Sequence, residues 1–376
     1  MRAIERDSAY GDGPLVVRPV VRSCALTFWV RRTAPGRRAP LWVDGWSGTV
    51  RSSTTRIGGL VAATDVADAV RGSDVLKPGG DADLTRLSQR LDDARAARLG
   101  ARIALVAMML GLALFSPRRV LMAGPAAIAA ALVLSAFGST SVLLFALLTL
   151  LGAFAPLRAL WLFLPVYLAV LALFPETASL TILGPHPQGA GRFHGVTNEV
   201  ETLLLAPALA LGLAAAPLVV ALVAWSRAGA DGGGALVFLS SYATLAWSRF
   251  TRNRVVLAVG ALAGVVLVTL ALVALDAATG GSNHVTRTVG DGPGAVWHAF
   301  THRWSVAWRG ATGTTGRAVL DAFLLAGLVW IAVQRPRRAI LDAFLVGIGV
   351  SLLVNDTPQD VLLWGSLQAL ALRRAL

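Results

Sequence analysis

The chain has 376 residues, of which 55% are hydrophobic and only 15% are charged, and its mean hydropathy is +0.65. This composition excludes an ordinary soluble globule of the same length and indicates a membrane protein that crosses the bilayer several times. The formal net charge of +13 is spread in short arginine clusters, so it excludes the continuous basic face of a nucleic-acid-binding protein. The single cysteine, Cys24, excludes an internal disulfide framework.

Residues 1–98 are predicted to form a small extracytoplasmic α/β fragment. The first 100 residues hold 16 basic and 11 acidic side chains and no apolar run of 18 residues. Strand-like apolar patterns occur at 15–21, 25–30 and 40–43. Residues 83–98 have the pattern of a charged amphipathic helix that leads into the bilayer.

One stretch of this fragment carries a resemblance. Residues 52–67 read SSTTRIGGLVAATDVA, and residues 74–78 read DVLKP. This pattern resembles the closing segment of alkaline-phosphatase-superfamily ectodomains, over about residues 40–82. Some bacterial envelope proteins carry such an ectodomain before a multi-span membrane domain, and the whole chain is similar to that arrangement.

The resemblance implies phosphoryl or lipid-carrier chemistry in the cell envelope, but only the end of such an ectodomain is present. The superfamily's nucleophile and metal ligands lie mostly upstream of this segment, and all five histidines of this chain follow residue 185. The fragment is therefore interpreted as a degenerate or truncated remnant. An export signal is expected upstream, because residues 1–30 contain no apolar signal-peptide region.

Residues 99–376 are predicted to form the transmembrane domain. The apolar segments are shorter than the roughly 20 residues of a straight span, so their ends must extend into flanking residues. They lie at 101–116, 120–137, 139–155, 159–174, 201–216, 217–227, 235–248, 255–275, 318–334, 339–355 and 360–372. The predicted fold is an all-α polytopic bundle of nine to eleven transmembrane segments, preceded by the α/β fragment.

Arginine placement predicts the orientation in a bacterial cytoplasmic membrane. If successive apolar segments cross the bilayer in alternate directions, the loops on one side contain eleven arginines and no acidic residue. These arginines are at positions 118, 119, 158, 249, 252, 254, 335, 337, 338, 373 and 374. By the positive-inside rule that side is cytoplasmic, so the C-terminus is cytoplasmic and the N-terminal region lies outside. All five histidines then face outward.

The pair of segments at 217–227 and 235–248 is a candidate broken span. Both segments either cross the bilayer or form a re-entrant pair, and the arginine pattern fits both arrangements. Asp231 is placed to cap a helix that begins near Ala235, and Gly232 and Gly233 allow close approach of a ligand to the backbone. Arg227 lies four residues before Asp231, so the two either pair structurally or serve an anion or proton pathway.

Residues 184–201 form a polar island between apolar runs, and they are the main candidate site. If a helix starts by Thr197, Asn198 and Glu201 share one face while Glu199 points elsewhere. The plain alternative is an outer loop whose helix is capped by Thr197 or Asn198. The spacing from His194 to Glu199 matches no metal signature, so neither a metal nor a cofactor is assigned.

Two further outward segments could line the same site. Asn283 and His284 precede a predicted amphipathic helix at 295–308, whose tryptophans are typical of interfacial anchoring. Asn355 and Asp356 end an apolar segment in a polar turn, which is either a helix end and loop or part of the site.

The first functional hypothesis is a cell-envelope membrane protein that binds or processes a phosphorylated lipid or lipid-linked glycan at the outer leaflet. Its candidate proton-transfer residues are His194, Glu199 and Glu201. Its candidate substrate-binding residues are Arg192, Asn198, Arg227, Asp231, Gly232, Gly233, Asn283, His284, Asn355 and Asp356. The alternatives are a transporter or flippase that uses Asp231 as a coupling carboxylate, and a non-catalytic membrane partner. The bilayer is the expected partner in each case.

Overall fold

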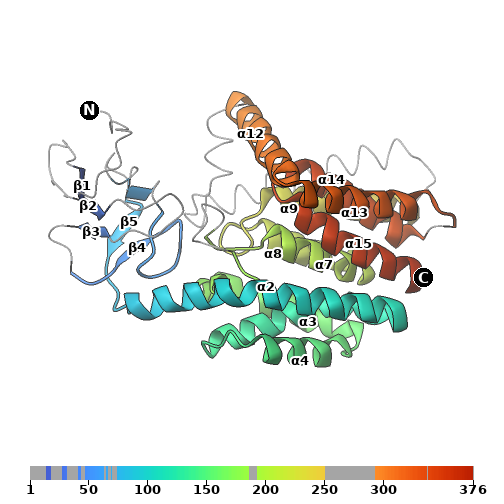
Figure 1. Ribbon diagram of the computed structural model, residues 1–376, viewed down its shortest axis with the longest axis horizontal. Helices are drawn as coiled ribbons and strands as arrows, with labels where there is room; N and C mark the ends of the chain where they lie inside the picture. The colour runs from blue at the N-terminus through green and yellow to red at the C-terminus, as the bar shows by residue number, and fades with distance from the viewer. Residues whose placement is uncertain are drawn as a thin grey trace. The chain divides into compact units, whose positions relative to one another are not determined.

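The computed structural model describes residues 14–17, 28–31, 41–43, 47–62, 65–66, 69, 74–185, 193–249, 293–336 and 338–375 (Figure 1). The chain divides into two compact units. The first comprises Met1–Asp93 and Pro185–His194, and the second comprises Ala94–Gly184 and Gly195–Leu376. The boundary expected after residue 98 lies inside one continuous helix, α2, which runs over Leu84–Phe115.

The first unit contains the short strands that the sequence predicts. An antiparallel sheet joins β1 (Pro14–Val17), β2 (Phe28–Arg31) and β3 (Leu41–Val43), in that order. A second antiparallel pair joins β4 (Val50–Ser52) and β5 (Leu76–Pro78). The three strand-like segments expected from the sequence are therefore confirmed as strands.

The described residues of the run at 52–67 form a polar turn that begins at the end of β4. Ser52 Oγ donates to the carboxylate of Asp65 and accepts from the backbone N–H of Thr54 at 3.0 Å and of Thr55 at 3.2 Å. Ile57 is buried in the same turn. These contacts give the run a structural role, and its relation to phosphatase ectodomains stays a prediction.

Asp83 fixes the start of α2, as the amphipathic pattern predicts. Its Oδ1 accepts from the backbone N–H groups of Thr85 at 2.9 Å and Arg86 at 3.0 Å, which satisfies donors that have no partner inside the helix. The helix then continues for 32 residues, about 48 Å at 1.5 Å per residue.

The described residues of the second unit form helices and the loops that connect them, with no strand among them. Ten of the eleven predicted apolar segments are helical, and the segment at 255–275 lies outside the described residues. The helices are α3 (Pro117–Ala136), α4 (Val142–Ala153), α5 (Leu160–Leu173), α6 (Pro175–Ser179), α7 (Asn198–Ala210), α8 (Ala216–Ala224), α9 (Gly232–Arg249), α12 (Pro293–Thr312), α13 (Thr315–Val333), α14 (Ala339–Val354) and α15 (Pro358–Ala375).

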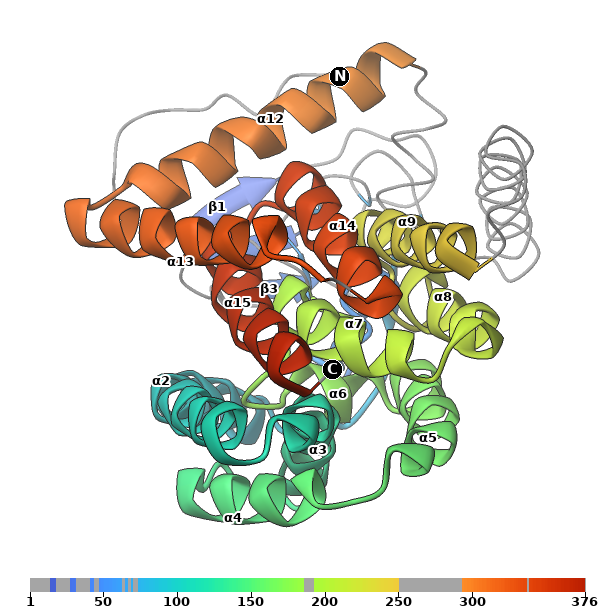
Figure 2. The ribbon, with the colours of Figure 1, turned by 90° about the vertical axis from the view of Figure 1, so that its right-hand side faces the viewer.

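Helix α7 lies at the centre of this unit. Figure 2 shows it surrounded by α3, α9, α14 and α15, and almost every residue of α7 is buried. The predicted single segment at 201–216 ends earlier than expected: α7 stops at Ala210, and Gly212 turns the chain at φ +82° before α8 begins. Only glycine adopts that backbone conformation without strain.

Three helices in the described part of the chain are long and apolar enough to span a membrane: α2, α3 and α13. The bent pair of α4 and α5, which meet at 113°, adds a fourth if it counts as one span. The remaining apolar helices are shorter. Large apolar side chains on α4 and α13, among them Leu147, Leu151 and Phe323, are exposed. A membrane protein accounts for such faces, and the number of nine to eleven spans stays a prediction.

Gly124 allows α3 to approach α7 closely. A Cβ at Gly124 would lie 2.5 Å from the carbonyl oxygen of Leu203, whereas a Cβ at Gly111 of α2 would meet nothing within 4 Å. We expect Gly124→Ala to lower the free energy of unfolding by about 1–3 kcal/mol, as overpacking does. Gly111→Ala, the matched control, should be neutral or stabilising by up to ~1 kcal/mol. Unfolding of both variants in mixed detergent micelles checks this, and equal effects would contradict the close packing.

Candidate functional site

The site begins at the N-terminus of α7. Thr197 is the capping residue, because its Oγ1 accepts from the backbone N–H of Val200 at 3.3 Å. Of the two caps that the sequence offers, Thr197 and Asn198, the helix uses Thr197, and its first turn carries Asn198, Glu199 and Glu201. All three are buried. At about 100° per residue, Glu199 and Glu201 face different neighbours.

Glu199 faces α2 and meets two arginines. Its Oε2 accepts from Arg98 Nη2 at 2.9 Å, and its Oε1 lies 3.5 Å from Arg102 Nε. Arg98 Nη1 also donates to the carbonyl oxygen of Gly184 at 3.3 Å. Glu199 is fully buried, whereas the side chains of Arg98 and Arg102 remain 17% and 26% exposed. The carboxylate thus lies inside the unit, and the two arginines lie closer to its surface.

Asp360 completes this ion-pair network from α15. Its Oδ1 accepts from Arg102 Nη2, and the guanidinium of Arg102 also lies 6.0 Å from the ring centroid of the buried Trp364. The network therefore joins α2, α7 and α15. We call Arg98 and Arg102 the arginine rim.

Glu201 faces the opposite way, toward α14. Its carboxylate accepts from Asn355 Nδ2 at 3.2 Å and from Ser351 Oγ at 3.3 Å. Asn355 Nδ2 is also 2.7 Å from Ser351 Oγ. Glu201, Ser351 and Asn355 are all buried. This polar cluster lies among apolar helices, where an ionisable side chain is costly and usually functional.

The break between α8 and α9 brings Asp231 to the same cluster. Positions 233 and 234 lie against it: a Cβ at Gly234 would be 2.9 Å from Glu201 Oε2 and 3.2 Å from Asp231 Cγ, and one at Gly233 would be 2.9 Å from Asn355 Oδ1. Asp231 is buried. We call Glu201, Asp231, Asn355 and Ser351 the carboxylate cluster.

Helix α9 begins at Gly232, three residues earlier than the sequence predicts near Ala235. The carbonyl oxygen of Asp231 accepts the first helical hydrogen bond, from Ala235 N at 3.0 Å. Asp231 therefore precedes the first residue of α9, the capping position that the sequence predicts for it, although the helix begins three residues earlier than expected. The chain before it is held by the hydrogen bond from Asp231 N to the carbonyl oxygen of Val223 at 2.9 Å.

Asn198 links the start of α7 to the turn before α15. Its Nδ2 donates to Asp356 Oδ1 at 3.1 Å and to Thr357 Oγ1 at 2.7 Å. Deeper in the unit, Gln368 of α15 donates to the carbonyl oxygen of Thr202 at 2.8 Å. The polar turn at 355–360 thus packs against α7.

The structure brings together Asn198, Glu201, Asp231, Asn355 and Asp356 of the predicted site residues, with Gly232 and Gly233 beside them. Glu199 is two residues from Glu201 but has different partners, and Arg227 is exposed. His194 belongs to the first unit, where its Nδ1 is 3.1 Å from the carbonyl oxygen of Thr54. Arg192, Asn283 and His284 lie outside the described residues.

Sequence reasoning missed the arginine rim and its partner Asp360. One signal was available: Arg98 and Arg102 are four residues apart at the start of an apolar run, so they share one helix face. Two arginines on one face of an apolar helix are expected to pair with acidic side chains nearby. The identity of these acidic partners depends on tertiary contacts. Glu199 is more than 100 residues from Arg98 along the chain, and Asp360 is more than 250 residues from Arg102.

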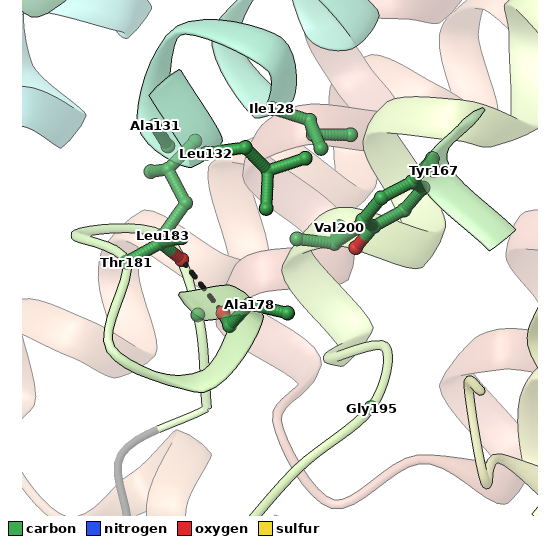
Figure 3. A pocket seen from close by; sticks show the side chains of 10 residues that line it. Ile128, Ala131, Leu132, Tyr167, Ala178, Thr181, Leu183, Gly195 and Val200 are labelled. Atoms are coloured by element: carbon green, nitrogen blue, oxygen red, sulfur yellow. Dashed lines mark hydrogen bonds between the residues drawn. The ribbon is translucent and has the colours of Figure 1, made fainter. Parts of the chain in front are cut away.

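A small cavity lies near the start of α7, with space at the lower limit for one water molecule. It is lined mainly by apolar side chains from α3, α6 and α7, and the hydroxyl-bearing side chains of Tyr167 and Thr181 lie on different sides of it (Figure 3). Thr181 Oγ1 donates to the carbonyl oxygen of Ala178 at 3.2 Å. The cavity is too small to hold a lipid headgroup.

The described residues contain no group of three or more histidine, cysteine or acidic side chains placed to hold a metal ion. Comparisons with protein-family models, with curated proteins and with solved structures give no significant match.

Proposed function

We propose that the chain is a multi-pass protein of the bacterial cytoplasmic membrane that binds an anionic headgroup, such as that of a phosphorylated lipid or lipid-linked glycan, at its arginine rim. The observation that carries this proposal is the pairing of two partly exposed arginines with a fully buried carboxylate. The two cations lie toward solvent and Glu199 lies inside, an order that suits capture of an anion followed by proton transfer.

The rim has unused binding capacity. A guanidinium has five N–H donors, and contacts among the described residues involve only Nη1 and Nη2 of Arg98 and Nε and Nη2 of Arg102. Arginine is suited to bidentate contacts with phosphate oxygens. Glu199 and Asp360 fix the two side chains in place, so a phosphate would meet pre-organised donors.

The proposal is tested with phosphatidic acid and with diacylglycerol of the same acyl chains, titrated onto the detergent-solubilised protein and followed by native mass spectrometry. The test variant is Arg98→Met/Glu199→Met, because removing both members of a buried ion pair spares the fold better than removing one. We expect tighter binding of the phosphate-bearing lipid to the wild type, and an at least tenfold loss of that preference in the variant. Equal binding of both lipids by the wild type would contradict the proposal.

A second candidate function, cation-coupled transport, is supported by a different observation. Glu201, Asp231 and Asn355 meet at a glycine-rich helix start in the break between α8 and α9. Secondary transporters build their coupling-ion sites at broken helices, and acidic side chains inside a membrane domain mark ion and proton pathways. The expected orientation leaves open whether this pair crosses or re-enters the bilayer.

Transport predicts an electrical signal that does not require a known substrate. In proteoliposomes on a solid-supported membrane, a sodium or proton concentration jump should displace charge in the wild type and not in Asp231→Asn. Asp342→Asn, which changes an acid in the first turn of α14, is the matched control and should keep the signal. A signal of equal size in Asp231→Asn would remove this candidate.

A further inference from the structure

Helix α12 carries a tryptophan face that neither the arginine rim nor the carboxylate cluster uses. Trp297, Trp304 and Trp308 are seven and four residues apart, so at 100° per residue they fall within an arc of about 40°. Their exposed fractions are 67%, 42% and 66%. Three large, exposed aromatic side chains on one face of one helix form a binding surface, here called the tryptophan face.

The other faces of α12 are different in character. His298, Ser305 and Arg309 follow the tryptophan face by about 80–120° around the helix, and all three are exposed. On the side toward the bundle, Ala307 is buried, and a Cβ at Gly310 would lie 3.7 Å from Gln359 of α15. The helix thus has a packed side, a polar side and a tryptophan face. Figure 2 shows it at the edge of the second unit, beside α13.

We infer that the tryptophan face binds the boundary between headgroups and acyl chains of a lipid bilayer. Tryptophan is enriched at that boundary because its ring is apolar and its indole N–H is polar. An amphipathic helix with aromatic residues on one face and a charged residue on another lies in the plane of the interface.

Two observations favour a bilayer over a protein partner. Helix α13 begins three residues after α12 ends, and it is among the candidate spans. Its apolar side chains, among them Val319, Leu320 and Phe323, are exposed, so the helix that follows the tryptophan face along the chain also presents a surface suited to lipid. The inference rests on the membrane location proposed above and not on headgroup binding at the arginine rim.

The position of α12 has a consequence for the candidate site. Gln359, which faces Gly310 of α12, directly precedes Asp360, and Asp360 holds Arg102. A helix anchored at headgroup depth therefore holds the first turn of α15, and with it the arginine rim, near that depth. This would place the rim where a phosphate group of a lipid resides.

The test uses a fluorescent label at single introduced cysteines in full-length protein that carries Cys24→Ser, reconstituted in vesicles of phosphatidylcholine and phosphatidylglycerol at a ratio of about 3:1. The labelled positions are Trp304→Cys on the tryptophan face, Ser305→Cys on the polar side as matched control, and Phe323→Cys in the middle of α13. Quenching is compared between lipids with a nitroxide on the headgroup and lipids with a nitroxide deep in the acyl chain.

We expect the headgroup nitroxide to quench the label at 304 at least twofold more than the label at 305, and the deep nitroxide to quench the label at 323 most. Deep quenching at 323 with equal quenching at 304 and 305 would overturn this inference and leave the membrane location intact. No lipid quenching at any position would overturn both. A label at 304 that is insensitive to lipid but changes with protein concentration would assign the tryptophan face to a second copy of the chain, and it would also overturn the inference.

Discussion

Replacing Glu199 by glutamine is expected to lower the free energy of unfolding of the second unit by about 3 kcal/mol, near the lower end of the range for breaking a buried ion pair. Glu199 is fully buried, and its carboxylate contacts both Arg98 and Arg102. Within the described network, the variant leaves Arg102 with Asp360 as its acidic partner and leaves Arg98 with none. Their partial exposure is the reason for choosing the lower end.

Unfolding by a graded transfer from mild detergent into dodecyl sulfate measures this loss. Glu176→Gln, at an exposed acid in the first turn of α6, is the control and should stay within about 0.5 kcal/mol of the wild type. The double variant Arg98→Met/Glu199→Met should recover most of the loss, since it removes the charge imbalance. A single variant as stable as the wild type would mean that this ion pair does not join α2 to α7.

The second large effect is expected for Gly195→Ala. Gly195 has φ +94°, and a Cβ there would lie 2.1 Å from the carbonyl oxygen of Gly229. The same carbonyl accepts from Val196 N at 2.9 Å. Backbone strain and the clash together predict that the free energy of unfolding falls by roughly 2–5 kcal/mol. Because the displaced loop leads to Asp231, the carboxylate cluster should also be disturbed.

Gly138→Ala separates the two causes of that loss. Gly138 also has a positive φ, of +67°, but a Cβ there would meet nothing within 4 Å. This control should therefore lower the free energy of unfolding only by the backbone strain, about 1–2 kcal/mol. Both variants are compared in the same detergent-unfolding experiment. Equal losses for Gly195→Ala and Gly138→Ala would show that the contact between Gly195 and Gly229 does not constrain the loop.

Local patterns in the sequence were sufficient to predict most of the helices and the different directions in which two neighbouring acidic side chains point. Helical periodicity alone predicts that Glu201 and Glu199 point in different directions, and the structure confirms it through their separate partners, α14 and α2. Capping chemistry predicts that α7 is capped by Thr197 or Asn198, and the structure shows that Thr197 is the cap. The amphipathic helix expected at 295–308 is present as the longer α12.

The partners of these side chains could not be predicted from local patterns. Arg102 appeared only as one residue of an apolar segment, and its contact with Asp360 depends on packing α2 against α15. Likewise, the meeting of Asp231 with Glu201 depends on Gly212, which ends the α7 region early and lets α8 and α9 fold back. Single-sequence reasoning detects the turn residue but not the direction in which the chain continues.

The central claim, that the second unit binds an anionic lipid through its arginine rim, is tested most directly by the lipids that remain with the purified protein. Lipids are extracted from wild type and from Arg98→Met/Glu199→Met, both purified in mild detergent from the same cells, and are identified by mass spectrometry. Arg118→Met, which changes an exposed arginine at the start of α3, serves as control. We expect a phosphorylated lipid to be retained by the wild type and by the control, and lost from the double variant. Equal retention by all three proteins, with the double variant folded, would contradict the claim.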